Sequence, residues 1–430
     1  MNGPRRAKPT LIGLAAALVA VSTLAAPALA TTAPLGPASP GAPCAWPVFF
    51  NVHNSQLLGL DSSAAYWDQP IVASEATRIT VSGTYPDAAY FSLQTYTPYA
   101  SPFSVKGVSS SLADYQVTPQ PGSTNPWQQR AAPGGRFQVT VRLDVVPGEA
   151  NELPFPAGTS PAHPGYLVYR VYLPAGGTFT HVKPPTLTVA NGPASGTLPT
   201  CRTHEPLPVP KKAPAGTTPP PPKVPPPAGA FFTPALSTYR SALADANDAY
   251  VGAYVIRPAP TDVLVVSAKA PTFPPGVGPS PWPAPGEDMQ YWSMCIILGK
   301  GSLPTVANQL PGGQVDYGCR ADEATKIDAS GYYHYVIGSE AQRAVISRVA
   351  GATFLPYSSS QTTPRGRPWP LYLLLLRNVL VSPDFAHSAQ KVARADDPRD
   401  AAAAMGTYYP RVSTCSLAAL TTKGLKACGS

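Results

Sequence analysis

Catalytic motifs with a defined spacing are almost absent from this sequence. The patterns G-x-S-x-G, H-E-x-x-H, the P-loop and G-x-G-x-x-G do not occur. Ser388 and Lys391 match S-x-x-K, in which a lysine lies one helical turn from a serine nucleophile, but the companion S-D-N and K-T-G motifs are missing. No catalytic residue is therefore assigned, and a non-enzymatic protein is the favoured interpretation.

Metal chemistry and paired-carboxylate chemistry also lack a local signature. The six histidines are His53, His163, His181, His204, His334 and His387, and no two have the spacing of a ligand pair. His334 lies between Tyr333 and Tyr335 on an expected strand. It either faces a cleft or is a surface or core histidine whose hydrogen bonds are satisfied within the fold, and we favour the second. The carboxylates considered for glycosidase chemistry, expected instead to be solvated, are Glu75, Asp87, Asp114 and Asp144. The sequence predicts no metal and no cofactor.

Arg170 is the strongest candidate for ligand binding. It stands among apolar strand residues, so it pairs with a buried carboxylate, faces solvent or awaits an anionic ligand. Tyr66, Tyr90 and Tyr291 lie on or beside expected strands, and tyrosine suits carbohydrate or amphiphile binding as well as core packing. We expect these four residues to line a ligand-binding face. Arg377, directly after the apolar run LYLLLL, poses the same question as Arg170.

Short β-strands are the elements that must position these residues. Alternation of apolar and polar residues with β-branched and aromatic types predicts strands at 77–84, 89–96, 136–145, 165–173, 250–257, 263–270, 291–298, 332–337 and 371–376. Three short helices are expected, over 233–246, from Ser382, and from Asp397 to a stop at Gly406. The fold class is mainly β, with two β-sandwich or jelly-roll-like regions joined by a Pro-rich linker and few short helices.

The domain order follows from composition. Residues 1–30 have a basic start, an apolar stretch and Ala28-Leu29-Ala30, which predicts a signal peptide cleaved after Ala30. Residues 31–43 form a Pro-rich lead, 44–201 an N-terminal β-sandwich domain, 206–234 a Pro-rich linker and 235–430 a β-rich domain with short helices. The alternative to cleavage is a retained membrane anchor, but the stretch is short for a span and Pro27 interrupts it.

Six cysteines in an exported chain predict disulfides rather than metal or thiol chemistry. Cys44 and Cys201 bracket the first region, Cys295 and Cys319 lie within one segment, and Cys415 and Cys428 lie near the end of the chain. We expect these three pairs, although the count alone permits fifteen pairings.

Composition sets broad limits on function. The chain has 430 residues, of which 44% are hydrophobic and 13% charged, so disorder of the whole is excluded. Its 56 prolines and 35 glycines disfavour long helices. The formal net charge is +8, but no run of five or more Lys or Arg occurs, which argues against nucleic-acid binding.

The chain resembles a family of uncharacterised exported proteins of high-GC bacteria, whose β-sandwich is similar to a bacterial domain of unknown function. The resemblance rests on 61–67, 77–86, 89–92, 114–116, 122–127 and 168–172 in the first half, and on 291–295, 328–333, the run ending at Arg377, and 405–410 with Cys415 in the second. It implies export and a β-sandwich fold but no activity.

Two functions stay open at this point. The leading hypothesis is an exported, non-catalytic surface or extracellular module that binds a glycan, lipid or protein ligand. The alternative is a secreted hydrolase or metal-dependent enzyme whose site is assembled only in three dimensions. In both, the protein is secreted and has no transmembrane segment after cleavage.

Overall fold

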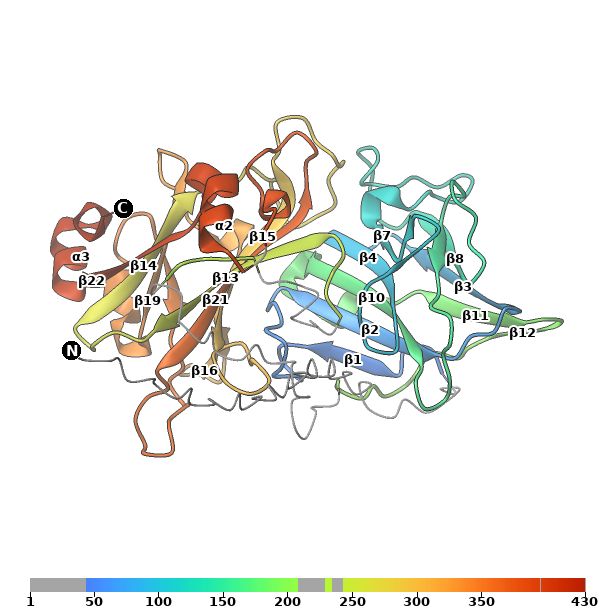
Figure 1. The fold of residues 1–430 in the computed structure, drawn as a ribbon, viewed down its shortest axis with the longest axis horizontal. Helices are drawn as coiled ribbons and strands as arrows, with labels where there is room; N and C mark the ends of the chain where they lie inside the picture. Colours follow the sequence, from blue (N-terminus) through green and yellow to red (C-terminus); the bar gives the residue numbers. More distant parts are fainter. Residues whose placement is uncertain (1–43, 208–228, 234–242, 395, 430) are drawn as a thin grey trace, which may run out of the picture. The chain divides into compact units, whose positions relative to one another are not determined.

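The computed structural model describes residues 44–207, 229–233, 243–394 and 396–429. The expected signal peptide 1–30, the lead 31–43 and most of the linker 206–234 lie outside the described residues, as does most of the helix expected over 233–246. The described chain is mainly β, as the sequence predicts, and its principal strands form two pairs of sheets (Figure 1).

The first region contains two five-stranded sheets. The first sheet has the order β1 (Val48–Asn51), β2 (Ala64–Ile71), β10 (Gly165–Pro174), β4 (Ala88–Tyr96), β7 (Ser111–Ala113), and all its neighbours are antiparallel. The second sheet has the order β12 (Ala194–Thr197), β11 (Thr186–Asn191), β3 (Thr77–Thr84), β8 (Arg136–Arg142), β9 (Glu152–Pro154), of which only β8 and β9 pair in parallel. Side chains such as Trp67, Val81, Val139 and Tyr169 fill the core between them.

The second region contains two four-stranded sheets. The third sheet has the order β13 (Asp248–Ile256), β21 (Leu371–Val381), β15 (Met289–Leu298), β18 (Cys319–Ala321), all antiparallel. The fourth sheet has the order β20 (Ala352–Pro356), β19 (Tyr332–Gly338), β14 (Asp262–Lys269), β22 (Arg411–Ser416), of which only β19 and β20 pair in parallel. Leu264, Val266, Trp292, Tyr335 and Leu374 belong to the core that these sheets share.

Two short hairpins complete the β structure. They pair β5 (Ser104–Val105) with β6 (Val108–Ser109) and β16 (Ala307–Gln309) with β17 (Val315–Tyr317). The short 3₁₀ helices are η1 (Asp114–Gln116), η2 (Ala175–Gly177), η3 (Phe179–His181), η4 (Asp322–Ala324), η5 (Glu340–Gln342), η6 (Ala389–Lys391), η7 (Gly406–Tyr408) and η8 (Leu425–Cys428).

The fourth sheet has an outer face, opposite the shared core, that is partly covered by helices. Ile346 of α1 (Arg343–Ile346) and Leu420 of α3 (Leu417–Lys423) pack with Val265 and Val336 on this face. Alternation along the strands therefore places Ser267 and His334 on the same outer face, beyond the helical cover.

Helix α2 (Pro398–Met405) agrees with the sequence. The side chain of Asp397 accepts a hydrogen bond from the Arg399 amide as N-cap, and Gly406 follows the last helical residue. The helix expected from Ser382 is wrong: the chain makes a turn there, with the Phe385 amide donating to the Ser382 carbonyl, before η6. The Ala389 amide donates to the side chain of Asn378 and not to a helical carbonyl. A tertiary contact therefore replaces the helical hydrogen bond that the local sequence predicts.

The three expected disulfides are confirmed. Cys44 bonds to Cys201, Cys295 to Cys319, and Cys415 to Cys428, and none of the six cysteines is free. Each bridge closes within one β region, so no disulfide joins the first region to the second.

A third cluster of buried side chains contains residues of both regions. Tyr66, Tyr90 and Tyr172 of the first sheet are buried in one cluster with Tyr291 and Val379 of the third sheet. Contacts of this kind place the described residues in one compact unit. The division into two domains at 206–234 stays a prediction about how the chain folds and is cleaved.

Candidate functional site

Arg170 is buried in the contact between the two regions. It lies on β10, its side chain is 1% exposed, and its Nη1 is 3.1 Å from Oδ2 of Asp245, which is fully buried. The second guanidinium nitrogen donates at 2.9 Å to the hydroxyl of Tyr96 and to the carbonyl of Leu243. Of the three roles considered for Arg170, the structure therefore shows pairing with a buried carboxylate.

The three candidate tyrosines surround the same contact. The hydroxyl of Tyr90 donates to Asp245 at 2.8 Å, and that of Tyr291 donates to Asp61 at 2.8 Å. The guanidinium carbon of Arg170 lies 5.2 Å from the centre of the Tyr66 ring. All three tyrosines are buried, so the structure brings the expected site residues together in an internal interface and not on an open ligand-binding face.

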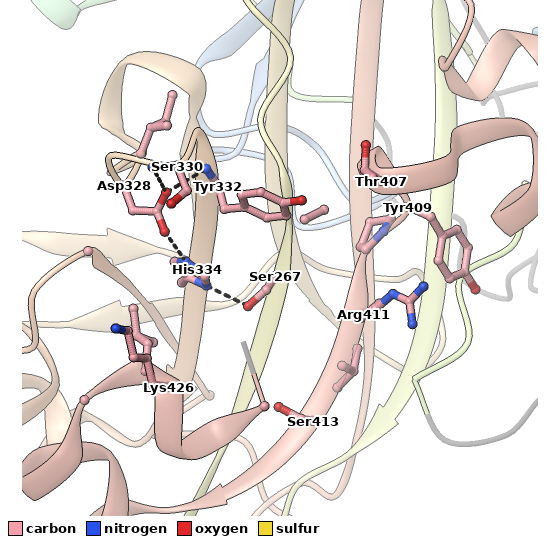
Figure 2. A pocket seen from close by; sticks show the side chains of 18 of the residues that line it. Ser267, Asp328, Ser330, Tyr332, His334, Thr407, Tyr409, Arg411, Ser413 and Lys426 are labelled. Carbon is pink, nitrogen blue, oxygen red and sulfur yellow. Dashed lines mark hydrogen bonds and ion pairs between the residues drawn. The ribbon is translucent and has the colours of Figure 1, made fainter.

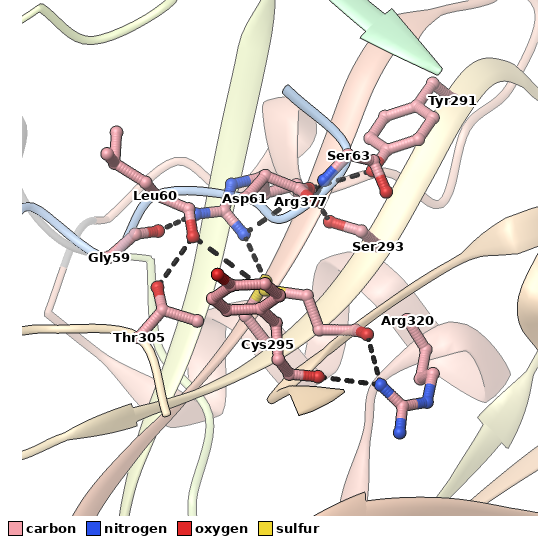
Figure 3. The surroundings of a disulfide bond; sticks show 12 residues. Gly59, Leu60, Asp61, Ser63, Tyr291, Ser293, Cys295, Thr305, Arg320 and Arg377 are labelled. Carbon is pink, nitrogen blue, oxygen red and sulfur yellow. Dashed lines mark hydrogen bonds and ion pairs between the residues drawn. A yellow bond between two sulfur atoms is a disulfide. The ribbon is translucent and has the colours of Figure 1, made fainter. Parts of the chain in front are cut away.

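Arg377 has the corresponding role on the other side of this interface. Its Nη1 lies 3.8 Å from Oδ2 of Asp61, an ion pair between two buried side chains, and it donates to the carbonyl of Gly59. The hydroxyl of Ser293 donates to the same carboxylate at 2.5 Å, and Figure 3 shows this set beside the Cys295–Cys319 disulfide. The two arginines thus join the regions through carboxylates that each accept several hydrogen bonds.

Among the described residues, one group has the spacing of metal ligands. Atoms of Asp61, Cys295 and Cys319 lie within 4.8 Å of one another. The two sulfurs form a disulfide, and a disulfide lacks the thiolate charge that binds zinc. Arg377 also donates to Cys295 Sγ at 3.0 Å, so the group already has a cationic partner. The contacts of these three residues are better explained by the interface between the two β regions than by a metal site.

The remaining sequence candidates are explained by their positions in the fold. Ser388 is buried before the 3₁₀ turn η6, so it is not one α-helical turn from Lys391. Glu75, Asp87 and Asp144 are exposed. For Asp114 the expectation of a solvated carboxylate is wrong, because it is buried and accepts hydrogen bonds from Gln290 and from the amide of Tyr115. Burial raises the pKa of Asp114 well above its usual value.

An open cavity of about 1560 Å³ lies on the outer face of the fourth sheet. Its wall includes β14, β19 and β22, the turn before β19, and the chain around η7 and η8. Ser267 and His334 enter it from directly opposed positions on β14 and β19. The neighbouring pair on the same face, Val265 of β14 and Val336 of β19, is apolar, so a polar pair at these positions is a departure from the pattern.

His334 connects a hydroxyl with a carboxylate in this cavity. Its Nδ1 is 2.8 Å from Oγ of Ser267, and its Nε2 is 3.1 Å from Oδ2 of Asp328 (Figure 2). His334 is 5% exposed, whereas the Asp328 side chain is 33% exposed. The expectation of a satisfied histidine and that of a histidine facing a cleft both hold at this position.

The turn before β19 fixes the carboxylate. Oδ1 of Asp328 accepts hydrogen bonds from the amides of Ser330 at 2.8 Å and Tyr332 at 2.9 Å. The Tyr332 amide first, and then His334 and the Ser330 amide, lower the pKa of Asp328. An ionised Asp328 favours the tautomer in which Nε2–H donates a hydrogen bond to it, and in that tautomer Nδ1 accepts a hydrogen bond from the Ser267 hydroxyl.

The charged residues of the cavity are mostly cationic. Arg411 of β22 lies opposite Ser267 in the sheet, and Lys423 and Lys426 come from the C-terminal end of α3 and from η8. All three are exposed, and no ion pair joins any of them to a carboxylate among residues 44–207, 229–233, 243–394 and 396–429. The carboxylate in the wall, Asp328, is already bonded to His334.

The sequence singled out His334 but not its two partners. Ser267 carries a weak signal, since it interrupts the apolar run 263–266 on a face that is otherwise buried. Asp328 reads as an ordinary turn residue, and only the fold shows that it returns to the histidine six positions later on β19.

Comparisons with known proteins give no family. No protein-family model matches the chain, and no curated protein matches it. Among solved structures, the chain is similar to an uncharacterised protein from Burkholderia cenocepacia, with 14% identity, a TM-score of 0.48, and coverage of 87% of this chain and 83% of that one. A protein from Vibrio parahaemolyticus has 12% identity and a TM-score of 0.39, with coverage of 83% and 90%.

Proposed function

We propose that the protein is an exported binding protein that takes an acidic glycan in the cavity on the outer face of the fourth sheet. Export is supported by the three disulfides, which are typical of oxidising compartments. No helix within the described residues is long and apolar enough to cross a bilayer.

The observation that carries the ligand class is the charge of the cavity. Arg411, Lys423 and Lys426 share the cavity wall with one carboxylate, Asp328, and that carboxylate already has a partner. Cationic side chains without a bound counter-charge attract carboxylate or sulfate groups, and arginine binds carboxylates through two parallel hydrogen bonds. Tyr332 and Tyr409, both half-buried in the wall, add ring surface of the kind that sugars contact.

The test compares an oligosaccharide of uronic acids with a neutral glucose oligosaccharide by calorimetric titration. Binding of the acidic probe that falls at least about tenfold in the Arg411→Gln/Lys426→Gln variant supports the proposal, since each lost charge contact is expected to contribute on the order of 1 kcal/mol. Arg348→Gln, an exposed position outside the cavity wall, is the matched control. Equal binding of both probes, or no binding, would contradict it.

The export half of the proposal has its own measurement. N-terminal sequencing of protein recovered from culture medium should begin at Thr31, because the apolar stretch ends at the small-x-small site Ala28–Ala30. A mature protein that still begins at Met1 would contradict export by cleavage.

A further inference from the structure

We propose that Ser267, His334 and Asp328 act as nucleophile, general base and orienting carboxylate in the hydrolysis of a carboxylic ester bound in the cavity. This activity goes beyond ligand binding, and it does not require the ligand to be acidic. It rests on the order of the three groups: hydroxyl, imidazole and carboxylate are joined by two hydrogen bonds of 2.8 and 3.1 Å.

The order of the groups matches the requirement for an activated serine. A serine hydroxyl is a weak nucleophile until a base within hydrogen-bonding distance removes its proton, and the base needs a third group to hold its tautomer. Here the carboxylate holds the proton on Nε2 and the hydroxyl faces Nδ1 of the same ring. The two ring nitrogens have exchanged tasks relative to the serine-protease arrangement: Nδ1 here meets the hydroxyl and Nε2 the carboxylate.

The position of Ser267 allows a substrate to reach it. The residue is half-buried in the cavity wall, whereas the histidine behind it is almost fully buried. Buried imidazole and an accessible hydroxyl are the arrangement needed for attack on a ligand, while a pair that only links two strands has no need of a cavity. Figure 2 shows the three side chains following one another along the wall.

The reaction balances with water as the second substrate. Oγ of Ser267 attacks the ester carbonyl carbon as its proton passes to Nδ1 of His334, and the imidazolium then returns this proton to the leaving alkoxide oxygen as the carbon–oxygen bond breaks. Water attacks the resulting acyl-serine and gives one proton to Nδ1, which returns it to Oγ as the acid leaves. Esters are the favoured class because an alkoxide departs more readily than an amide nitrogen.

Arg411 is the side chain that we assign to the negative charge on the carbonyl oxygen. It is the residue opposite Ser267 on β22, so both side chains stand on the same face of the sheet. In Figure 2 its guanidinium is turned toward Tyr409, and stabilisation of the oxyanion therefore requires a change of rotamer.

A fluorophosphonate probe tests the nucleophile without a known substrate. The full mature chain is incubated with the probe, and the modified residue is located by peptide mass spectrometry. Labelling at Ser267 that disappears in His334→Gln supports the proposal, and Ser347→Ala, an exposed serine outside the wall, is the control that should label like the parent. A folded protein with no label on Ser267 would overturn it.

Hydrolysis of p-nitrophenyl butyrate gives the second readout. Ser267→Ala and Asp328→Asn should each lower kcat/KM by at least about 1000-fold, as expected when a nucleophile or the group that sets a histidine tautomer is lost. Circular dichroism and melting temperatures of the same variants identify any that fail to fold. Esterase activity unchanged in folded Ser267→Ala would overturn the proposal, whereas loss of glycan binding alone would contradict only the proposed ligand.

Discussion

Arg170 Nη1 lies 3.1 Å from Asp245 Oδ2, and the two side chains are buried to 1% and 0% exposure. One residue comes from β10 of the first region, and the other lies three residues before the start of β13 in the second. An ion pair so far from solvent stabilises a fold only while both partners are present, because either charge left alone has lost its hydration. The pair therefore acts as a specific connection between the regions.

Arg170→Met should lower the free energy of unfolding by about 3 to 5 kcal/mol, the usual cost of breaking a buried pair. Methionine keeps much of the packing of the stem, so the loss reports the charge left on Asp245. Urea denaturation measures it, and Arg170→Met/Asp245→Asn should lose less than the two single variants added together. A variant that unfolds like the parent but no longer binds ligand would return Arg170 to the ligand-binding role.

Cleavage of the linker should leave the two regions associated. Trypsin is expected to cut first at Lys211, Lys212 or Lys223, because Pro-rich sequence of this composition does not form a packed core. The cut chain should still elute as one species in gel filtration, since buried ion pairs and the cluster around Tyr172 and Tyr291 join the regions. Separation of the fragments without reductant would show that the interface is weak in solution.

The strand pattern was the most predictable part of the fold. Period-two alternation predicted 77–84 at its observed bounds, because buried and part-exposed residues alternate along β3. The β-branched and aromatic residues of 165–173 predicted β10 to within one residue, although β10 is buried along nearly its whole length. Strand β2 is buried on both faces like β10 but was not predicted, because Asp68, Gln69 and Pro70 interrupt its apolar residues.

The candidate site was less predictable, because its contacts join residues that are distant in sequence. Alternation indicated that Arg170 is on a strand, but not whether a carboxylate from the other region covers it, because Asp245 is distant in sequence. The contact of Ser267 with His334 depends on the register of β14 against β19, and no local pattern sets that register. Pairings within a strand or turn can be read from sequence, whereas pairings between strands depend on the whole fold.

Asp68 should make stability fall as pH rises. Its side chain is buried, Oδ1 has no hydrogen-bond partner among the described residues, and burial raises the pKa to about 8. The folded state thus holds a proton that the unfolded chain releases near pH 4, so the stabilisation is complete below about pH 4 and is lost progressively up to about pH 8. Asp68→Asn should reduce the slope of unfolding free energy against pH by about 1.4 kcal/mol per unit in this window.

Part of the slope should remain in that variant, because burial also raises the pKa of Asp322 to about 8. Glu75→Gln, at an exposed carboxylate, is the matched control and should leave the slope as it is. Denaturation curves between pH 4 and 8 compare the three proteins. An unaltered slope in Asp68→Asn would mean that Asp68 stays ionised in the folded protein.

The Cys44–Cys201 and Cys415–Cys428 disulfides should contribute unequally to stability. Cys44–Cys201 closes a sequence separation of 157 residues, whereas Cys415–Cys428 closes 13. The entropy that a bridge removes from the unfolded chain grows with the logarithm of loop length, which gives about 4 to 5 kcal/mol for the first and about 3 kcal/mol for the second. Double Cys→Ser variants compared by urea denaturation measure both losses.

The short bridge is the matched control for the long one, since both replace two sulfurs by hydroxyls of similar size. The Cys295–Cys319 bridge is unsuitable for this comparison because Arg377 donates to Cys295, so its removal also alters the buried ion pair. A greater loss for Cys415→Ser/Cys428→Ser than for Cys44→Ser/Cys201→Ser would contradict the chain-entropy account. It would place the contribution of the short bridge in the folded state, where Ser413 donates a hydrogen bond to the carbonyl of Cys428 beside the cavity.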